Sequence, residues 1–179
     1  MKSLVLFGDS LLGRFNRDYT LQLENSIKDI TVYNCATGGF NSRDGLKRAN
    51  FIAKLKPDYI LLSLGANDAI PENNQPVSLN EFKENLISII KAFAGSTIIL
   101  FTCPYVDIVN NQEETGKFNG LLKEYNSVVK NISLEKKIHL LNSEKIYRSL
   151  KDYHMGDGLH MNKLGYDVLI RKLTQLIKE

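Results

Sequence analysis

The chain has 179 residues, of which 43% are hydrophobic and 24% charged, and its formal net charge is +3. This composition is typical of a globular protein and excludes disordered and fibrous classes, and the length predicts one domain over residues 1–179. The positive charges are scattered, so nothing indicates nucleic-acid binding. No apolar run reaches the ~18 residues of a membrane span, and no signal-peptide core precedes Gly8, so we expect a cytoplasmic protein. The sequence carries no signal for an oligomeric state.

The first half of the chain alternates short apolar runs with stretches of helical periodicity. The elements expected there, in chain order, are a strand at Leu4–Phe7, a helix after the turn at Ser10, a strand at Thr31–Asn34, a helix from its N-cap Ser42 to about Leu55, and a strand at Tyr59–Leu64. The last of these is continuously apolar, as a strand buried on both faces must be.

The second half repeats the alternation. The elements expected there are a helix at the capping box Ser78–Glu81, a strand at Thr97–Thr102, a helix from about Gly116, a strand at Ile138–Leu141, a short helix at Glu144–Leu150 and a last helix capped by Asn162. Spaced apolar residues, which include Phe118 and Leu122, mark the helix after Gly116, and the apolar stripe of the helix after Ser78–Glu81 is expected to face the core.

Strands that alternate with helices predict an α/β fold in which a parallel sheet lies between two helical layers. Right-handed crossovers favour a flavodoxin-like five-stranded sheet of order 2-1-3-4-5. In that order Cys35 and Cys103 follow strands roughly 14 Å apart. A disulfide needs Cα atoms within about 7 Å, so both thiols are expected to be free.

Four segments place small or polar residues at or beyond strand ends. They are Gly8-Asp9-Ser10, Gly38-Gly39, Gly65-Ala66-Asn67-Asp68 and Asp157-Gly158-Leu159-His160. Because parallel strands end at one edge of a sheet, which is where ligands bind in such folds, these segments are expected to converge.

The converging groups are those of a serine acyl hydrolase. Ser10 would be the nucleophile and His160 its base, with Asp157 accepting a hydrogen bond from the other ring nitrogen. The Ser10 and Gly39 N–H groups and the Asn67 amide would donate to the oxyanion. No zinc-type spacing, phosphate-binding glycine loop or nucleophile elbow occurs, so no metal or other cofactor is expected.

These four blocks, in this order, resemble the GDSL or SGNH hydrolase family, and the resemblance extends from residue 4 to about 170. It implies a flavodoxin-like fold and metal-independent hydrolysis of carboxylic esters, with Ser10, Asp157 and His160 as catalytic residues. The second block departs from the family pattern at Ala36 and Phe40.

Simpler interpretations compete at several positions. Gly-Asp-Ser alone is usually a turn, and Asn67 could merely close one. His154, two residues after Asp152, is an alternative base. Asp9 and Asp68 are expected to brace loops rather than to react. Four further residues flank the blocks as candidate substrate contacts, with core packing as the alternative for the aromatic ones: Leu11, Phe40, Tyr105 and Met161.

The expected partner is a small-molecule ester. The loops at 66–77 and 103–116 are rich in amide and carboxylate side chains, and no apolar cap segment occurs. This favours small acyl groups, above all acetyl, on polar alcohols or carbohydrates. The alternatives are a lysophospholipase or acyl-thioesterase with longer acyl chains, and a non-catalytic binding module on the same fold.

Overall fold

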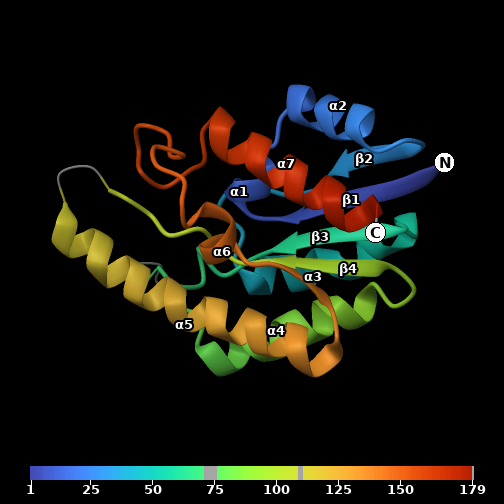
Figure 1. The fold of residues 1–179 in the computed structure, drawn as a ribbon. Helices are drawn as coiled ribbons and strands as arrows, with labels where there is room; N and C mark the ends of the chain where they lie inside the picture. Colours follow the sequence, from blue (N-terminus) through green and yellow to red (C-terminus); the bar gives the residue numbers. More distant parts are fainter. Residues whose placement is uncertain (71–75, 109–110, 179) are drawn as a thin grey trace.

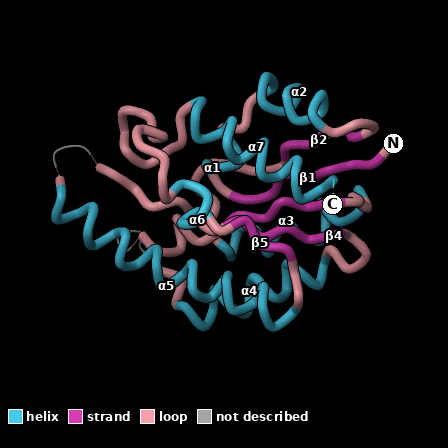
Figure 2. Tube along the Cα trace, viewed as in Figure 1, coloured by secondary structure: helices cyan, strands magenta, loops and turns pink. Residues whose placement is uncertain are grey.

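A computed structural model of the protein describes residues 1–70, 76–108 and 111–178. In these residues five strands form one parallel sheet of order β2-β1-β3-β4-β5 (Figure 2). The strands are β1 (Lys2–Gly8), β2 (Ile30–Asn34), β3 (Tyr59–Ser63), β4 (Thr97–Phe101) and β5 (His139–Leu141). The order is the one predicted, and each strand end lies within two residues of its predicted position.

The three inner strands are buried on both faces, which explains their continuous apolar runs. Successive side chains point to opposite faces: Val5 and Phe7 belong to one core, whereas Leu4 and Leu6 belong to the other. A strand with this environment cannot alternate polar and apolar residues, so the sheet interior could be predicted directly from the runs.

The helices form two layers (Figure 1). They are α1 (Ser10–Gly13), α2 (Arg17–Ser26), α3 (Ser42–Ile52), α4 (Leu79–Ala92), α5 (Gln112–Lys136), α6 (Ser143–Tyr147) and α7 (Lys163–Lys178), with a 3-10 turn at Ala53–Leu55. Apolar side chains of α3, α4 and α5 fill the core on one face of the sheet, and those of α2 and α7 fill the other. None of the helices in the described residues is long and apolar enough to cross a membrane.

Two helix starts differ from the predictions. The segment after Ser10 is not one helix, because Asn16 accepts hydrogen bonds from the N–H groups of Asp18 and Tyr19 and so begins a second helix, α2. The N-cap of α3 is Asn41 rather than Ser42. The Ser42 N–H instead donates to both carboxylate oxygens of Asp68, at 2.9 and 3.1 Å.

Helix α5 begins four residues before the predicted Gly116, because Asn111 caps it by accepting from the N–H of Glu114. It therefore extends well beyond the strand ends (Figure 1). Helix α6 is shorter than predicted and ends at Tyr147. The polar loops predicted at 66–77 and 103–116 include residues 71–75 and 109–110, which lie outside the described residues.

Candidate active site

Ser10 lies where β1 passes directly into α1. The Asp9 side chain caps this short helix by accepting from the Leu11 N–H at 2.9 Å, which fixes the turn on both sides of Ser10. The neighbouring loop is tied to the same strand end, since the Thr37 N–H donates to the Gly8 carbonyl at 3.0 Å. The Ser10 hydroxyl is thus held at the carboxyl edge of the sheet, as predicted for a ligand site of this architecture.

His160 and Asp157 complete a hydrogen-bonded chain with Ser10. The His160 Nε2 lies 3.0 Å from the Ser10 Oγ, and its Nδ1 lies 2.6 Å from the Asp157 Oδ2. With Asp157 ionised, Nδ1 carries the proton and donates it, which leaves the Nε2 lone pair to accept from the serine hydroxyl. These three residues, of which Ser10 and His160 are 150 positions apart in the chain, have the geometry of a nucleophile, base and orienting carboxylate.

The Asp157 carboxylate is held in its charged form. Partial burial opposes ionisation, but it is outweighed by the backbone N–H and ring of His160 and by the N–H of Leu159, which lower the pKa of Asp157 to about 2. The carboxylate therefore stays negative at any pH at which the imidazole acts as a base.

The segment that carries Asp157 and His160 is anchored on the loop after β4. The Asp107 N–H donates to the Gly158 carbonyl at 2.8 Å. Gly158 has φ +66°, and a Cβ there would lie 1.9 Å from the Asp107 carbonyl oxygen, so only glycine fits. This contact explains why a glycine separates Asp157 from His160.

His154, the alternative base, is turned away from Ser10. Its Nε2 donates to the Tyr105 carbonyl at 2.8 Å, and the Tyr153 hydroxyl donates to the same oxygen at 3.1 Å. The Asn162 amide in turn donates to the His154 carbonyl at 3.0 Å. The structure therefore brings His160, and not His154, to the serine.

Gly39 and Asn67 lie in the same pocket as Ser10. Gly39 has φ +80°, a conformation that favours glycine, and no described residue other than its chain neighbours lies within 4 Å of the position that a Cβ would take. The Asn67 Nδ2 donates to the Phe40 carbonyl at 2.9 Å, which orients the amide across the loop that contains Gly39. Next to it, Asp68 binds the Ser42 N–H and braces the loop, as expected.

The pocket has a volume of about 370 Å³ and is apolar over much of its wall. Beyond Ser10 and Leu11, its apolar lining includes Ile70, Cys103, Val106, Phe118, Leu122 and Leu159. Phe118 and Leu122 come from the apolar stripe of α5, which packs in the core and also lines this pocket. The pocket wall is thus more apolar than the polar composition of the loops at 66–77 and 103–116 indicates.

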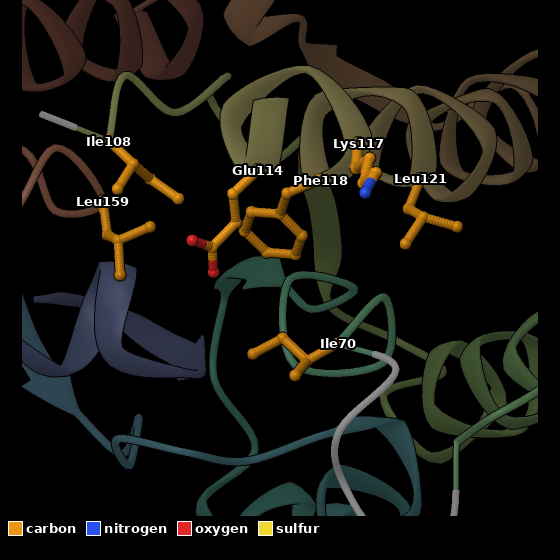
Figure 3. A pocket seen from close by; sticks show the side chains of 7 residues that line it. All are labelled: Ile70, Ile108, Glu114, Lys117, Phe118, Leu121 and Leu159. Carbon is orange, nitrogen blue, oxygen red and sulfur yellow. The ribbon is translucent and has the colours of Figure 1, made fainter. Parts of the chain in front are cut away.

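A second pocket of about 300 Å³, here called the Phe118 chamber, shares Ile70, Phe118 and Leu159 with the first (Figure 3). Its other lining residues are Ile108, Leu121, Glu114 and Lys117. In Figure 3 the Glu114 carboxylate points into the space between Leu159 and Phe118. The chamber is therefore apolar on its walls but holds charged groups.

Of the four candidate substrate contacts, Leu11 lines the pocket of Ser10. Phe40 packs under the guanidinium of Arg48 instead, and Tyr105 contributes its carbonyl to the anchor of His154. Met161 is buried and lines a different, adjacent pocket. Both cysteines are free, as predicted.

Residues 6–168 match the model of the GDSL-like lipase/acylhydrolase family. The chain belongs to this family. A lipase/acylhydrolase from Enterococcus faecalis has a similar structure, with a TM-score of 0.84 and 26% identity over 99% of this chain and 96% of that one. The match agrees with the predicted family and fold.

Two curated relatives of the GDSL chain are longer proteins. It is 32% identical, over 82% of its length, to the uncharacterized esterase YxiM of Bacillus subtilis, and 28% identical, over 85%, to an N-acylneuraminate cytidylyltransferase of Escherichia coli. The chain spans 42% of the first relative and 36% of the second.

Proposed function

We propose that the chain is a serine esterase that hydrolyses small acyl esters, above all acetyl esters, of polar alcohols or carbohydrates. The observation that carries the proposal is the continuous chain of hydrogen bonds from Ser10 through His160 to Asp157, with distances of 3.0 and 2.6 Å. Membership of a lipase/acylhydrolase family supports ester hydrolysis as the reaction class.

The reaction follows from the positions of these groups. The Ser10 Oγ attacks the ester carbonyl carbon while the His160 Nε2 accepts the hydroxyl proton, which gives a tetrahedral oxyanion facing the N–H groups of Ser10 and Gly39 and the Asn67 amide. His160 then passes the proton to the alkoxy oxygen as the C–O bond breaks and the alcohol leaves. A water molecule, deprotonated by His160, then attacks the acyl carbon. As the bond between that carbon and the Ser10 Oγ breaks, His160 returns the proton to the Oγ, which releases the acid and restores the serine hydroxyl.

The test combines covalent labelling with turnover. Ser10→Ala is expected to abolish labelling by a fluorophosphonate and to lower hydrolysis of p-nitrophenyl acetate by at least about 10³-fold. Ser127→Ala, which removes an exposed hydroxyl on α5, is the matched control and should behave as the unmodified protein. If the adduct maps to another residue, or if the unmodified protein is no faster than Ser10→Ala, the proposal is wrong and a binding module is the better interpretation.

The Phe118 chamber favours a second candidate function, hydrolysis of longer acyl esters or thioesters. An alkyl chain that entered it would gain about 0.8 kcal/mol for each buried methylene group. Against this, the exposed Glu114 and Lys117 line the same chamber, and an alkyl chain there would have to displace water from their charged groups, which is costly. We therefore favour short acyl groups.

A further inference from the structure

Arg14 lies between the pocket of Ser10 and a neighbouring pocket of about 380 Å³, and its side chain lines both. Its position is fixed from the backbone, since the Arg14 N–H donates to the Ser10 carbonyl at 3.0 Å and closes the single turn of α1. The neighbouring pocket, here called the Arg14 pocket, is also lined by Asn16, Tyr19, Met161, Lys163 and Tyr166.

The Arg14 pocket carries one uncompensated positive charge. In the part of the chain that the structure describes, the Arg14 guanidinium makes one hydrogen bond, to the Met155 sulfur at 3.8 Å, and no carboxylate lies within ion-pair distance of it. The other cation, Lys163, is already paired with Asp167 at 2.7 Å. A guanidinium at the mouth of a catalytic pocket offers two parallel N–H donors, which match a carboxylate.

The walls of the Arg14 pocket are rigid and partly aromatic. The rings of Tyr19 and Tyr166 lie 4.7 Å apart between centroids, and the Tyr166 hydroxyl donates to the Leu11 carbonyl at 2.8 Å, next to Ser10. Tyr166 is buried, so the partly exposed ring of Tyr19 is the aromatic surface that a ring-shaped ligand could contact.

The two ends of an ester need different surroundings at Ser10. Around the tetrahedral carbon, the oxyanion faces Gly39 and Asn67, and the acyl and alcohol parts take the two remaining directions. The side formed by Val106, Phe118 and Leu122 is apolar and suits the acyl group. The side of Arg14 is polar and cationic, and so suits the alcohol.

On the basis of the proposed esterase activity, we propose that Arg14 binds a carboxylate on the alcohol part of the substrate. The substrate class is then an O-acylated hydroxy acid, such as an acidic sugar, rather than an ester of a neutral alcohol. The single uncompensated charge matches a carboxylate better than a phosphate dianion.

The experiment compares 4-acetoxybenzoate with its methyl ester, which has the same acyl group and lacks the negative charge. The ratio of kcat/KM for the acid to that for the methyl ester is expected to fall about tenfold in Arg14→Gln, mainly through KM, as expected for the loss of a charge-assisted hydrogen bond. In Arg17→Gln, which removes an exposed charge three residues away, this ratio should stay within about twofold of its value in the unmodified protein.

Calorimetric binding of 4-hydroxybenzoate measures carboxylate recognition without turnover. It should weaken by about the same factor in Arg14→Gln and stay unchanged in Arg17→Gln. Equal ratios and equal affinities in the unmodified protein and Arg14→Gln would refute the role of Arg14. Absence of Ser10-dependent hydrolysis of the methyl ester would instead refute the proposed esterase, and the binding result would still decide the question of Arg14.

Discussion

Asp9 is a fully buried carboxyl beside Ser10, and its environment favours the neutral form. Burial, reinforced by the nearby charge of Asp68, outweighs the hydrogen bond from the Leu11 N–H and raises the pKa of Asp9 to about 7. One of its oxygens has no partner among the described residues. This residue braces the turn, as its place in the motif predicted, at an electrostatic cost when it ionises.

That cost predicts a pH dependence of stability. An unfolded aspartate has a pKa of about 3.9, so between pH 4 and 7 the native state holds a proton that the unfolded state has released. The free energy of unfolding should therefore fall with rising pH across this range, by up to about 1.4 kcal/mol per pH unit from this group, and its stabilising contribution is complete only below pH 4. Urea unfolding at several pH values measures the slope.

The Asp9→Asn variant isolates this contribution. Asparagine is also a good N-cap and can accept from the Leu11 N–H, but it does not titrate, so the slope between pH 4 and 7 should flatten. Asp18→Asn, which changes an exposed side chain in the first turn of α2, should keep the original slope. If Asp9→Asn retains the full slope, Asp9 is not the titrating group.

Single residues also mark the limit of prediction from sequence. Ser10, Asn67, Asp157 and His160 could be found because each ends or follows a strand in a recognisable block. Arg14 belongs to no periodic pattern, and its position depends on a four-residue helix whose end is set by the Asn16 cap of α2. A lone arginine in such a place is indistinguishable from a surface charge until the pocket is seen.

At the scale of elements, the segment from 152 to 162 carries two histidines with different surroundings. His154 and Tyr153 both donate to the Tyr105 carbonyl, whereas His160 contacts Ser10. Removing the His154 hydrogen bond should lower the free energy of unfolding by about 1 kcal/mol. The same change should leave the rate of p-nitrophenyl acetate hydrolysis within about threefold of that of the unmodified protein, because the Tyr153 and Asp107 contacts remain.

The comparison of His154→Ala with His160→Ala tests this assignment. Loss of a general base costs about 10²–10⁴-fold in rate, so His160→Ala should lose nearly all activity while unfolding close to the temperature of the unmodified protein. A folded but inactive His154→Ala would move the base to His154 and contradict the geometry of the site.

The apolar stripe of helix α5 has two roles, of which the core-packing one follows from periodicity alone. The stripe was correctly predicted, and Val129 and Ile132 pack in the core below the sheet. The same stripe continues to Phe118, which packs against this core and also lines the Phe118 chamber (Figure 3). The helix itself extends beyond the strand ends (Figure 1). Periodicity reports which face of a helix is apolar, but whether that face meets a core or a pocket depends on where the sheet stops.

At the scale of the whole molecule, the sheet edge, α5 and the loop after β4 together enclose the space in which we propose that the acyl group lies. The Phe118 chamber would lengthen it, but the Glu114 carboxylate points into that space (Figure 3). Glu114 also accepts from the Asn111 amide at the start of α5, which holds it near the mouth of the chamber. We therefore expect the charge of Glu114, and not the shape of the cavity, to limit the length of the acyl chain.

A series of p-nitrophenyl esters from acetate to octanoate tests this limit. The unmodified protein should have its highest kcat/KM for the shortest esters. Glu114→Leu removes the charge from the chamber, so the octanoate-to-acetate ratio of kcat/KM should rise about tenfold or more, as each methylene that gains an apolar contact contributes about 0.8 kcal/mol. Glu124→Leu, the matched control, replaces an exposed glutamate further along α5 that is not among the residues lining the chamber, and should leave the ratio unchanged. A preference of the unmodified protein for octanoate would show that the chamber already accepts long chains and would replace the short-acyl proposal with the second candidate function.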